Sequence, residues 1–100
     1  MALEIKENRG IFEIDGNILS PNLGALKIYF ENVLESNDSI VISLERVKKM
    51  DSSSALFFEN IYKYGAERNK IVSIVGRQNN EISEIMKVTK TSYILSSDRV

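Results

Sequence analysis

Two short apolar runs, separated by a helical pattern, constrain the fold of this 100-residue chain more than any other feature. Residues 39–44 and 71–76 are of strand length and nearly unbroken in apolar character, which is typical of strands covered on both faces. Between them, small, apolar and aromatic side chains recur at helical spacing from Ala55 to Gly65, which indicates a helix. Strands that alternate with helices favour parallel pairs joined by right-handed crossovers. The sequence therefore predicts an α/β fold.

The remaining segments complete the predicted order of elements. The turn residues Asp15-Gly16-Asn17 follow two alternating segments, which predicts an N-terminal hairpin that ends there. Ser20-Pro21 is typical of a helix start with the Ser20 hydroxyl as N-cap. In chain order, the predicted elements are strands over residues 3–6 and 11–14, a helix over 21–36, a strand over 39–44, a helix over 52–68, a strand over 71–76, a helix over 79–88 and an edge strand over 92–95. The order β-β-α-β-α-β-α-β predicts one domain over residues 1–100, with a mixed sheet of four to five strands.

Composition narrows the functional classes. Cysteine and histidine are both absent, so disulfides, thiolate metal sites and the commonest general base are excluded. Thirteen basic and 14 acidic residues are mixed along the chain, with a net charge of −1, and we therefore expect no nucleic-acid partner. No apolar run reaches the roughly 18–20 residues of a membrane span. We expect a cytoplasmic protein that has no cofactor and does not insert into a membrane.

The segment that follows the central strand is the candidate functional site. Asp51, Ser52, Ser53 and Ser54 stand where the second helix is predicted to begin. Free backbone N–H groups and the positive end of the helix dipole favour an anion at such a position. Two interpretations remain open: the serines are an ordinary helix cap, or one of them is phosphorylated. A phosphate there would leave the fold intact but would oppose an interface over the same spot, because desolvating it would be costly.

Nucleophilic catalysis by these serines is not expected. A serine nucleophile needs an activating base, the chain has no histidine, and no Ser-x-x-Lys spacing begins at any of the three serines. The glycines are not clustered, so a phosphate-binding glycine loop is absent as well.

The predicted second helix carries a wider apolar surface than one packing face needs. Phe57, Ile61 and Tyr64 form a stripe beside the one that contains Phe58, and Leu56 lies next to it. Both stripes can pack on the sheet, or part of the second one is exposed for a partner. Spacing alone leaves the helical phase open, so both alternatives stand. We expect Leu56 and Phe57 among the partner-binding residues.

The chain resembles the STAS domain family, shared by bacterial anti-sigma factor antagonists and sulfate transporters. The motif Met50-Asp51-Ser52-Ser53 matches the family signature M-D-S-[ST]-G, and the hairpin, helices and strands around it follow in the family's order. The resemblance covers nearly the whole chain. It implies a single-domain STAS-like fold with helices packed mainly on one face of the sheet. The sequence departs from the pattern where Ser54 replaces the glycine and where Leu19 replaces an acidic residue.

The resemblance also implies a regulatory binding protein without catalysis of its own. In antagonists of this type, an anti-sigma factor that is also a serine kinase phosphorylates the serine after the Asp, and a phosphatase removes the phosphate. By position, Ser52 is the expected phosphorylation site, and Asp51, Ser53 and Ser54 are expected partner contacts. The loop over residues 16–19, with Asn17 and Leu19, is expected to present a second contact. The alternative is a constitutive STAS subunit of a lipid-transporting ABC complex, and a homodimer stays open.

Overall fold

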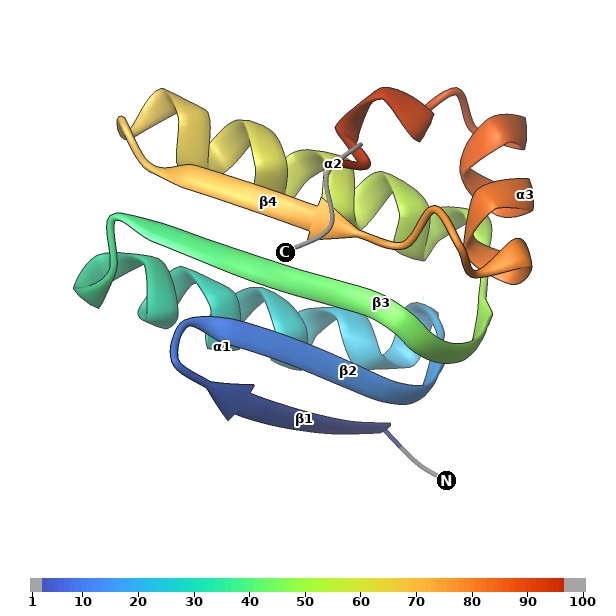
Figure 1. The fold of residues 1–100 in the computed structure, drawn as a ribbon, viewed down its shortest axis with the longest axis horizontal. Helices are drawn as coiled ribbons and strands as arrows, with labels where there is room; N and C mark the ends of the chain where they lie inside the picture. The colour runs from blue at the N-terminus through green and yellow to red at the C-terminus, as the bar shows by residue number, and fades with distance from the viewer. Residues whose placement is uncertain (1–2, 97–100) are drawn as a thin grey trace.

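The computed structural model describes residues 3–96 and shows a four-stranded sheet with helices on one side (Figure 1). The elements are β1 (Leu3–Asn8), β2 (Ile11–Ile18), the 3₁₀ turn η1 (Ser20–Asn22), α1 (Leu23–Ser36), β3 (Ser39–Met50), α2 (Ser52–Glu67), β4 (Ile71–Val75), α3 (Asn80–Val88) and the 3₁₀ turn η2 (Ser92–Ile94). The strands lie in the order β1-β2-β3-β4. β1 is antiparallel to β2, whereas β2, β3 and β4 are parallel to one another. The predicted mixed sheet and α/β class are confirmed.

The N-terminal hairpin closes through a two-residue turn. Arg9 and Gly10 both have positive φ angles, of 56° and 83°, as a type I′ turn requires. Asn8 lies opposite Ile11 where the hairpin begins. The hairpin is confirmed, but its second strand extends further than predicted.

β2 runs through the residues that were expected to end it. Asp15, Gly16 and Asn17 belong to the strand, which continues to Ile18. Its register against β3 shifts twice in this stretch, and Gly16 has a φ of 112°. These irregularities are typical of β-bulges, which absorb turn-forming residues without breaking the pairing. The prediction of a loop over residues 16–19 is therefore wrong for Gly16–Ile18, because pairing with β3 outweighs the local turn preference.

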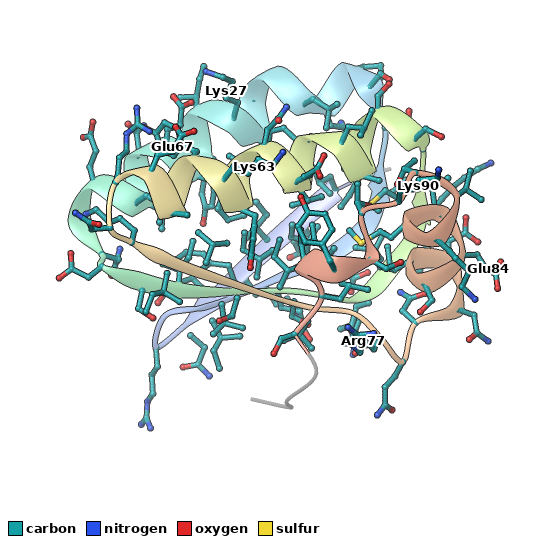
Figure 2. The ribbon with its side chains drawn as sticks, turned by 90° about the horizontal axis from the view of Figure 1, so that it is seen from above. Lys27, Lys63, Glu67, Arg77, Glu84 and Lys90 are labelled. Carbon is teal, nitrogen blue, oxygen red and sulfur yellow. The ribbon has the colours of Figure 1, made fainter. Side chains whose placement is uncertain are left out.

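The core lies between the sheet and the layer formed by α1 and α2, which Figure 2 shows on one side of the strands. Ile14, Ile42 and Ile74 on the strands and Phe30 and Phe58 on the helices are fully buried. The opposite face of the sheet is only half-buried along the middle of β3 and β4. The expectation that the central strand is covered on both faces is therefore wrong. The apolar run that suggested it combines one core-facing row with a partly exposed one.

Asn79 joins α3 to the central strand. Its Oδ1 accepts hydrogen bonds from the first amides of α3, at 3.0 Å from Glu81 and 3.4 Å from Ile82. Its Nδ2 lies 2.8 to 3.1 Å from three backbone carbonyl oxygens of β3, on residues Leu44, Glu45 and Val47. One side chain therefore caps a helix and satisfies strand carbonyls that sheet pairing leaves free.

The end of the described chain differs from the prediction. Residues Ser92–Ile94 form η2, and Leu95 makes a single parallel bridge to Ile74, so the expected edge strand over 92–95 is wrong. Ile94 and Leu95 are adjacent and both buried, whereas successive side chains of a strand point to opposite faces. Burying both therefore favours a tight turn. None of the helices within residues 3–96 is long and apolar enough to cross a membrane.

Candidate functional site

The candidate site lies where β3 passes directly into α2. Met50 ends the strand, Asp51 is the N-cap in extended conformation, and Ser52 is the first residue of the helix. The first amides of a helix have no carbonyl partner within it. The backbone N–H of Ser54, one of these unpartnered amides, donates a hydrogen bond to Asp51 Oδ1 at 2.9 Å. The predicted position of Ser52 at the amino end of α2 is confirmed, and its side chain is exposed.

The second carboxylate oxygen of Asp51 reaches a distant segment. Oδ2 accepts hydrogen bonds from both the backbone N–H and the hydroxyl of Ser20, at 3.0 and 3.1 Å. Ser20 follows β2 and is 31 residues away in the sequence. The prediction that the Ser20 hydroxyl caps its own helix is wrong, since Leu19 is the cap residue of η1 and the hydroxyl is committed to Asp51. Asp51 thus holds the starts of two helical segments together.

The electrostatics of Asp51 follow from these contacts. Burial raises the pKa of its carboxyl group, but the hydrogen bonds from Ser54 and Ser20 together outweigh burial and hold the pKa below its ordinary value. Hydrogen bonds to the charged form of a carboxyl group favour that form. Asp51 is therefore an anion at neutral pH, and both of its oxygens are occupied by the protein itself.

Ser54 is an internal part of this arrangement. Its hydroxyl lies 2.6 Å from Asp51 Oδ1 and 3.0 Å from the carbonyl oxygen of Ile18, and its side chain is 0% exposed. The expectation that Ser54 contacts a partner is therefore wrong. Its hydroxyl is used to join α2 to the end of β2. Sequence reasoning missed Ser20 and this role of Ser54, because neither spacing nor composition signals a contact over more than 30 residues.

The remaining residues predicted for phosphorylation or partner binding differ in how exposed their side chains are. Ser52, Ser53 and Asn17 are exposed, and Leu19 is half-buried. Leu56, one turn after Ser52 on the same side of α2, is 46% exposed. The structure therefore brings hydroxyl groups and one large apolar side chain together at an accessible helix end.

Phe57 belongs to the core. Its side chain is 9% exposed and packs edge-to-face against Phe58, with ring centroids 5.1 Å apart. The expectation that Phe57 contacts a partner is wrong, because the helical phase turns it toward the interior. Among residues 3–96, no group of three His, Cys, Asp or Glu side chains is placed to hold a metal ion.

Comparisons with known proteins agree with this architecture. A family model described as STAS domain matches residues 1–95. The solved structure of the unphosphorylated form of the anti-sigma factor antagonist SpoIIAA is 14% identical, with a TM-score of 0.69, over 99% of this chain and 90% of that one. An anti-sigma factor antagonist from Mycobacterium paratuberculosis is 15% identical, with a TM-score of 0.69, over 94% of this chain and 81% of that one.

A third solved structure, of Mglu, is much longer than the chain described here. It is 12% identical, with a TM-score of 0.60, and the match covers 71% of this chain but only 18% of Mglu. At these identities the likeness to solved structures extends to the fold alone. No curated protein matches the sequence.

Proposed function

This chain belongs to the STAS domain family, and we propose that it is a non-catalytic regulatory protein, an anti-sigma factor antagonist that is switched by phosphorylation of Ser52. Its partners are an anti-sigma factor serine kinase and a phosphatase. The observation that carries the proposal is the exposed hydroxyl of Ser52 at the first position of α2, directly after the occupied carboxylate of Asp51. That hydroxyl is accessible to a kinase, whereas Ser54 is not.

The surroundings of Ser52 support a switch that acts on binding and spares the fold. A phosphate carries about −1.5 to −2 charges near neutral pH, and the positive end of the α2 dipole offsets part of that charge. Asp51 is held in place on both oxygens by Ser20 and Ser54, so it cannot turn away to relieve repulsion. A partner that covers this end of α2 would have to desolvate two neighbouring negative groups. Phosphorylation therefore weakens binding.

The unphosphorylated surface has the composition of a small contact site. Leu56 offers a large apolar side chain, and Ser52 and Ser53 add exposed hydroxyl groups one turn before it on α2. An exposed apolar centre within a polar rim is the usual anatomy of a protein interface. Asn17 is exposed near the end of β2, opposite Lys49 near the end of β3, and we propose it as a further partner contact.

Kinase treatment followed by intact-mass measurement tests the proposal. We expect one phosphoryl group on the wild type and on Ser53→Ala, and none on Ser52→Ala. Ser52→Asp should weaken kinase binding by at least about tenfold, equivalent to about 1.4 kcal/mol. Phosphate on Ser53 in place of Ser52, or unchanged affinity of the Ser52→Asp variant, would contradict the switch.

The role of Ser54 favours a second candidate function. This residue stands at the glycine position of the family signature and links α2 to Ile18 and Asp51. It gives a rigid end to α2 that needs no added charge, as a constitutive STAS subunit of an ABC-type lipid transporter complex would require. Stable co-purification with an ATPase that is insensitive to Ser52→Asp would favour this candidate over the switch.

A further inference from the structure

The outer edge of β1 carries unpaired backbone groups. β1 lies at one end of the strand order and pairs with β2 alone (Figure 1). In a hairpin closed by a two-residue type I′ turn, the two residues that flank the turn exchange backbone hydrogen bonds, and bonded pairs then alternate with non-bonded ones. Here the flanking pair is Asn8 and Ile11. The N–H and C=O groups of Asn8, Lys6 and Glu4 therefore point toward β2.

The same alternation turns the backbone groups of Leu3, Ile5 and Glu7 away from the sheet. One hydrogen bond supports this assignment of inward and outward backbone groups: the amide of Val41 on β3 donates to the carbonyl of Gly10 at 2.9 Å. Gly10 precedes Ile11, so the groups of β2 that face β3 are those that do not face β1. Leu3, Ile5 and Glu7 thus present a row of backbone donors and acceptors that no strand within residues 3–96 pairs with.

The opposite edge of the sheet is different. Ile74 on β4 is bridged by Leu95, and the amide of Ser96 donates to the Ile74 carbonyl at 2.7 Å. Arg77 holds this crossing segment by donating to the carbonyls of Leu95 and Ser96, at 3.0 and 3.2 Å. Within residues 3–96, the middle of the β4 edge is therefore covered, whereas the β1 edge is open. An open edge with unpaired groups is a template for another strand.

An apolar groove follows the open edge. A groove of about 390 Å³ runs between β1 and the start of α1, and its walls include Leu3, Ile5, Ala25 and Tyr29. Leu3 and Ile5 are only half-buried, and Tyr29 on α1 is 36% exposed. Apolar side chains are thus left without cover on the side of β1 where the backbone is also unpaired.

The side chains of β1 are complementary to those of a second β1. In an antiparallel pair centred on Ile5, each Ile5 faces its copy, Glu4 faces the partner's Lys6, and Leu3 faces the partner's Glu7. In this register, the outward N–H and C=O groups of Leu3, Ile5 and Glu7 lie opposite those of the partner strand and can form hydrogen bonds with them. Centring the pair one residue earlier or later would set Glu4 against its copy or Lys6 against its copy. Opposite charges across neighbouring strands stabilise pairing, and like charges oppose it.

We propose that this protein forms a homodimer in which β1 pairs antiparallel with β1 of a second copy, about a two-fold axis at Ile5. The two sheets become one continuous sheet, and the two α1 helices lie on the same side of it. Tyr29, which lines the groove beside β1, then lies on the side of α1 toward the partner, and the two grooves flank the new strand pair. Such an interface is isologous, as in most homodimers. It does not depend on the proposed role of Ser52.

Charge reversal in β1 tests the register. We expect wild-type protein to show a concentration-dependent doubling of mass in sedimentation velocity. Lys6→Glu alone and Glu4→Lys alone should each weaken self-association about tenfold, because both Glu–Lys pairs become like-charge pairs. An equimolar mixture of the two variants should form a heterodimer at least as strong as the wild-type dimer. The matched control Lys87→Glu makes the same charge change on α3 and should leave the dimer intact.

A backbone variant separates strand pairing from charge. Ile5→Pro removes the outward N–H group, which the hairpin does not use, and proline is tolerated on edge strands. We expect a folded monomer with the circular dichroism spectrum of the wild type. A wild type that stays monomeric at every concentration would overturn the proposal. It would also fail if the mixture formed no heterodimer, or if Lys6→Glu left the dimer unchanged, since the copies would then meet elsewhere.

Discussion

The amino ends of α2 and α3 are built on the same pattern but serve different purposes. Each begins after an Asx cap, Asp51 or Asn79, whose side-chain oxygen accepts from the first turn of the helix. A carboxylate can only accept, so the free oxygen of Asp51 takes donors from Ser20. An amide can also donate, so Asn79 reaches the carbonyls of β3. The charged cap therefore fastens two helix starts at the surface, while the neutral cap fastens a helix to the sheet.

This difference explains which helix end can serve as a contact site. The side-chain amide of Asn79, the α3 cap, donates to carbonyl groups of β3, so removing it leaves those carbonyl groups unpaired. The carboxylate of Asp51, the α2 cap, accepts hydrogen bonds from Ser20 and Ser54. Ser52 and Ser53 remain exposed beside it. A rigid helix end with exposed hydroxyl groups suits recognition. We therefore expect the α3 end to govern stability and the α2 end to govern binding.

The largest effect should come from Asn79→Ala. It removes a helix cap and leaves three carbonyl groups of β3 without their partner. We expect a loss of about 3 kcal/mol in the free energy of unfolding, measured in urea. Asn80→Ala, at the next and exposed position, is the matched control and should cost less than about 0.5 kcal/mol. Equal effects of the two variants would contradict the role of Asn79 in joining α3 to β3.

Asp51→Asn should have the next largest effect and should depend on pH. The amide keeps one acceptor for the donors of Ser20 and Ser54, so we expect a loss of about 1.5 kcal/mol at pH 7. The pKa of Asp51 is lowered in the folded state. Its stabilising contribution is therefore present above the ordinary pKa of about 3.9 and is lost as the pH falls through the folded value.

The measurement for Asp51 is the unfolding free energy between pH 7 and pH 2. The gap between wild type and Asp51→Asn should narrow below about pH 4. The gap between wild type and Asn79→Ala should not share this dependence, because an amide does not titrate. A constant gap for Asp51→Asn would show that its charge contributes nothing.

Ser54→Ala should cost about 1 kcal/mol in thermal or urea unfolding. The variant removes the hydroxyl that lies between Asp51 and the carbonyl of Ile18, and it leaves the rest of the helix start in place. Ser53→Ala, at the preceding exposed position, should stay within about 0.5 kcal/mol of the wild type. If Ser53→Ala proved the more damaging, the inward role of Ser54 would be wrong.

The smallest effect should come from negative charge at the first helical position. Ser52 in α2 and Asn80 in α3 are equivalent first residues, and an acid there interacts favourably with the helix dipole by about 0.3–1 kcal/mol. Asn80→Asp should therefore stabilise slightly. Each new acid would have a charged neighbour, Glu81 beside Asn80 and Asp51 beside Ser52. Ser52→Asp should still gain less or nothing, because Ser20 and Ser54 hold the Asp51 carboxylate in place. A stability loss above about 1 kcal/mol for Ser52→Asp would contradict a switch that spares the fold.

Much of the fold could be predicted because its signals are local. The helical stripe from Ala55 onward and the strand runs over 39–44 and 71–76 indicate α2, β3 and β4 correctly, but β3 continues to Met50, six residues beyond the predicted strand, because it pairs with β2 over that stretch. Asp51 and Ser52 fall at the start of α2 because a helix that follows a strand begins at its capping residue. The errors concern residues whose surroundings come from elsewhere in the chain. The inward turn of Phe57 depends on a helical phase that spacing leaves open by about one residue, or roughly 100° at 3.6 residues per turn.

The amino-acid sequence alone was enough to predict the order of strands and helices up to α3, the position of Ser52 and the absence of histidine and cysteine chemistry. These follow from periodicity, capping and composition, which act over a few residues. The tertiary structure decided that β2 continues through Asp15-Gly16-Asn17, that Ser54 faces inward and that Ser20 binds Asp51. Each of these depends on contacts between segments about 30 residues apart, and their free energy outweighs the local preference of any single turn or hydroxyl group.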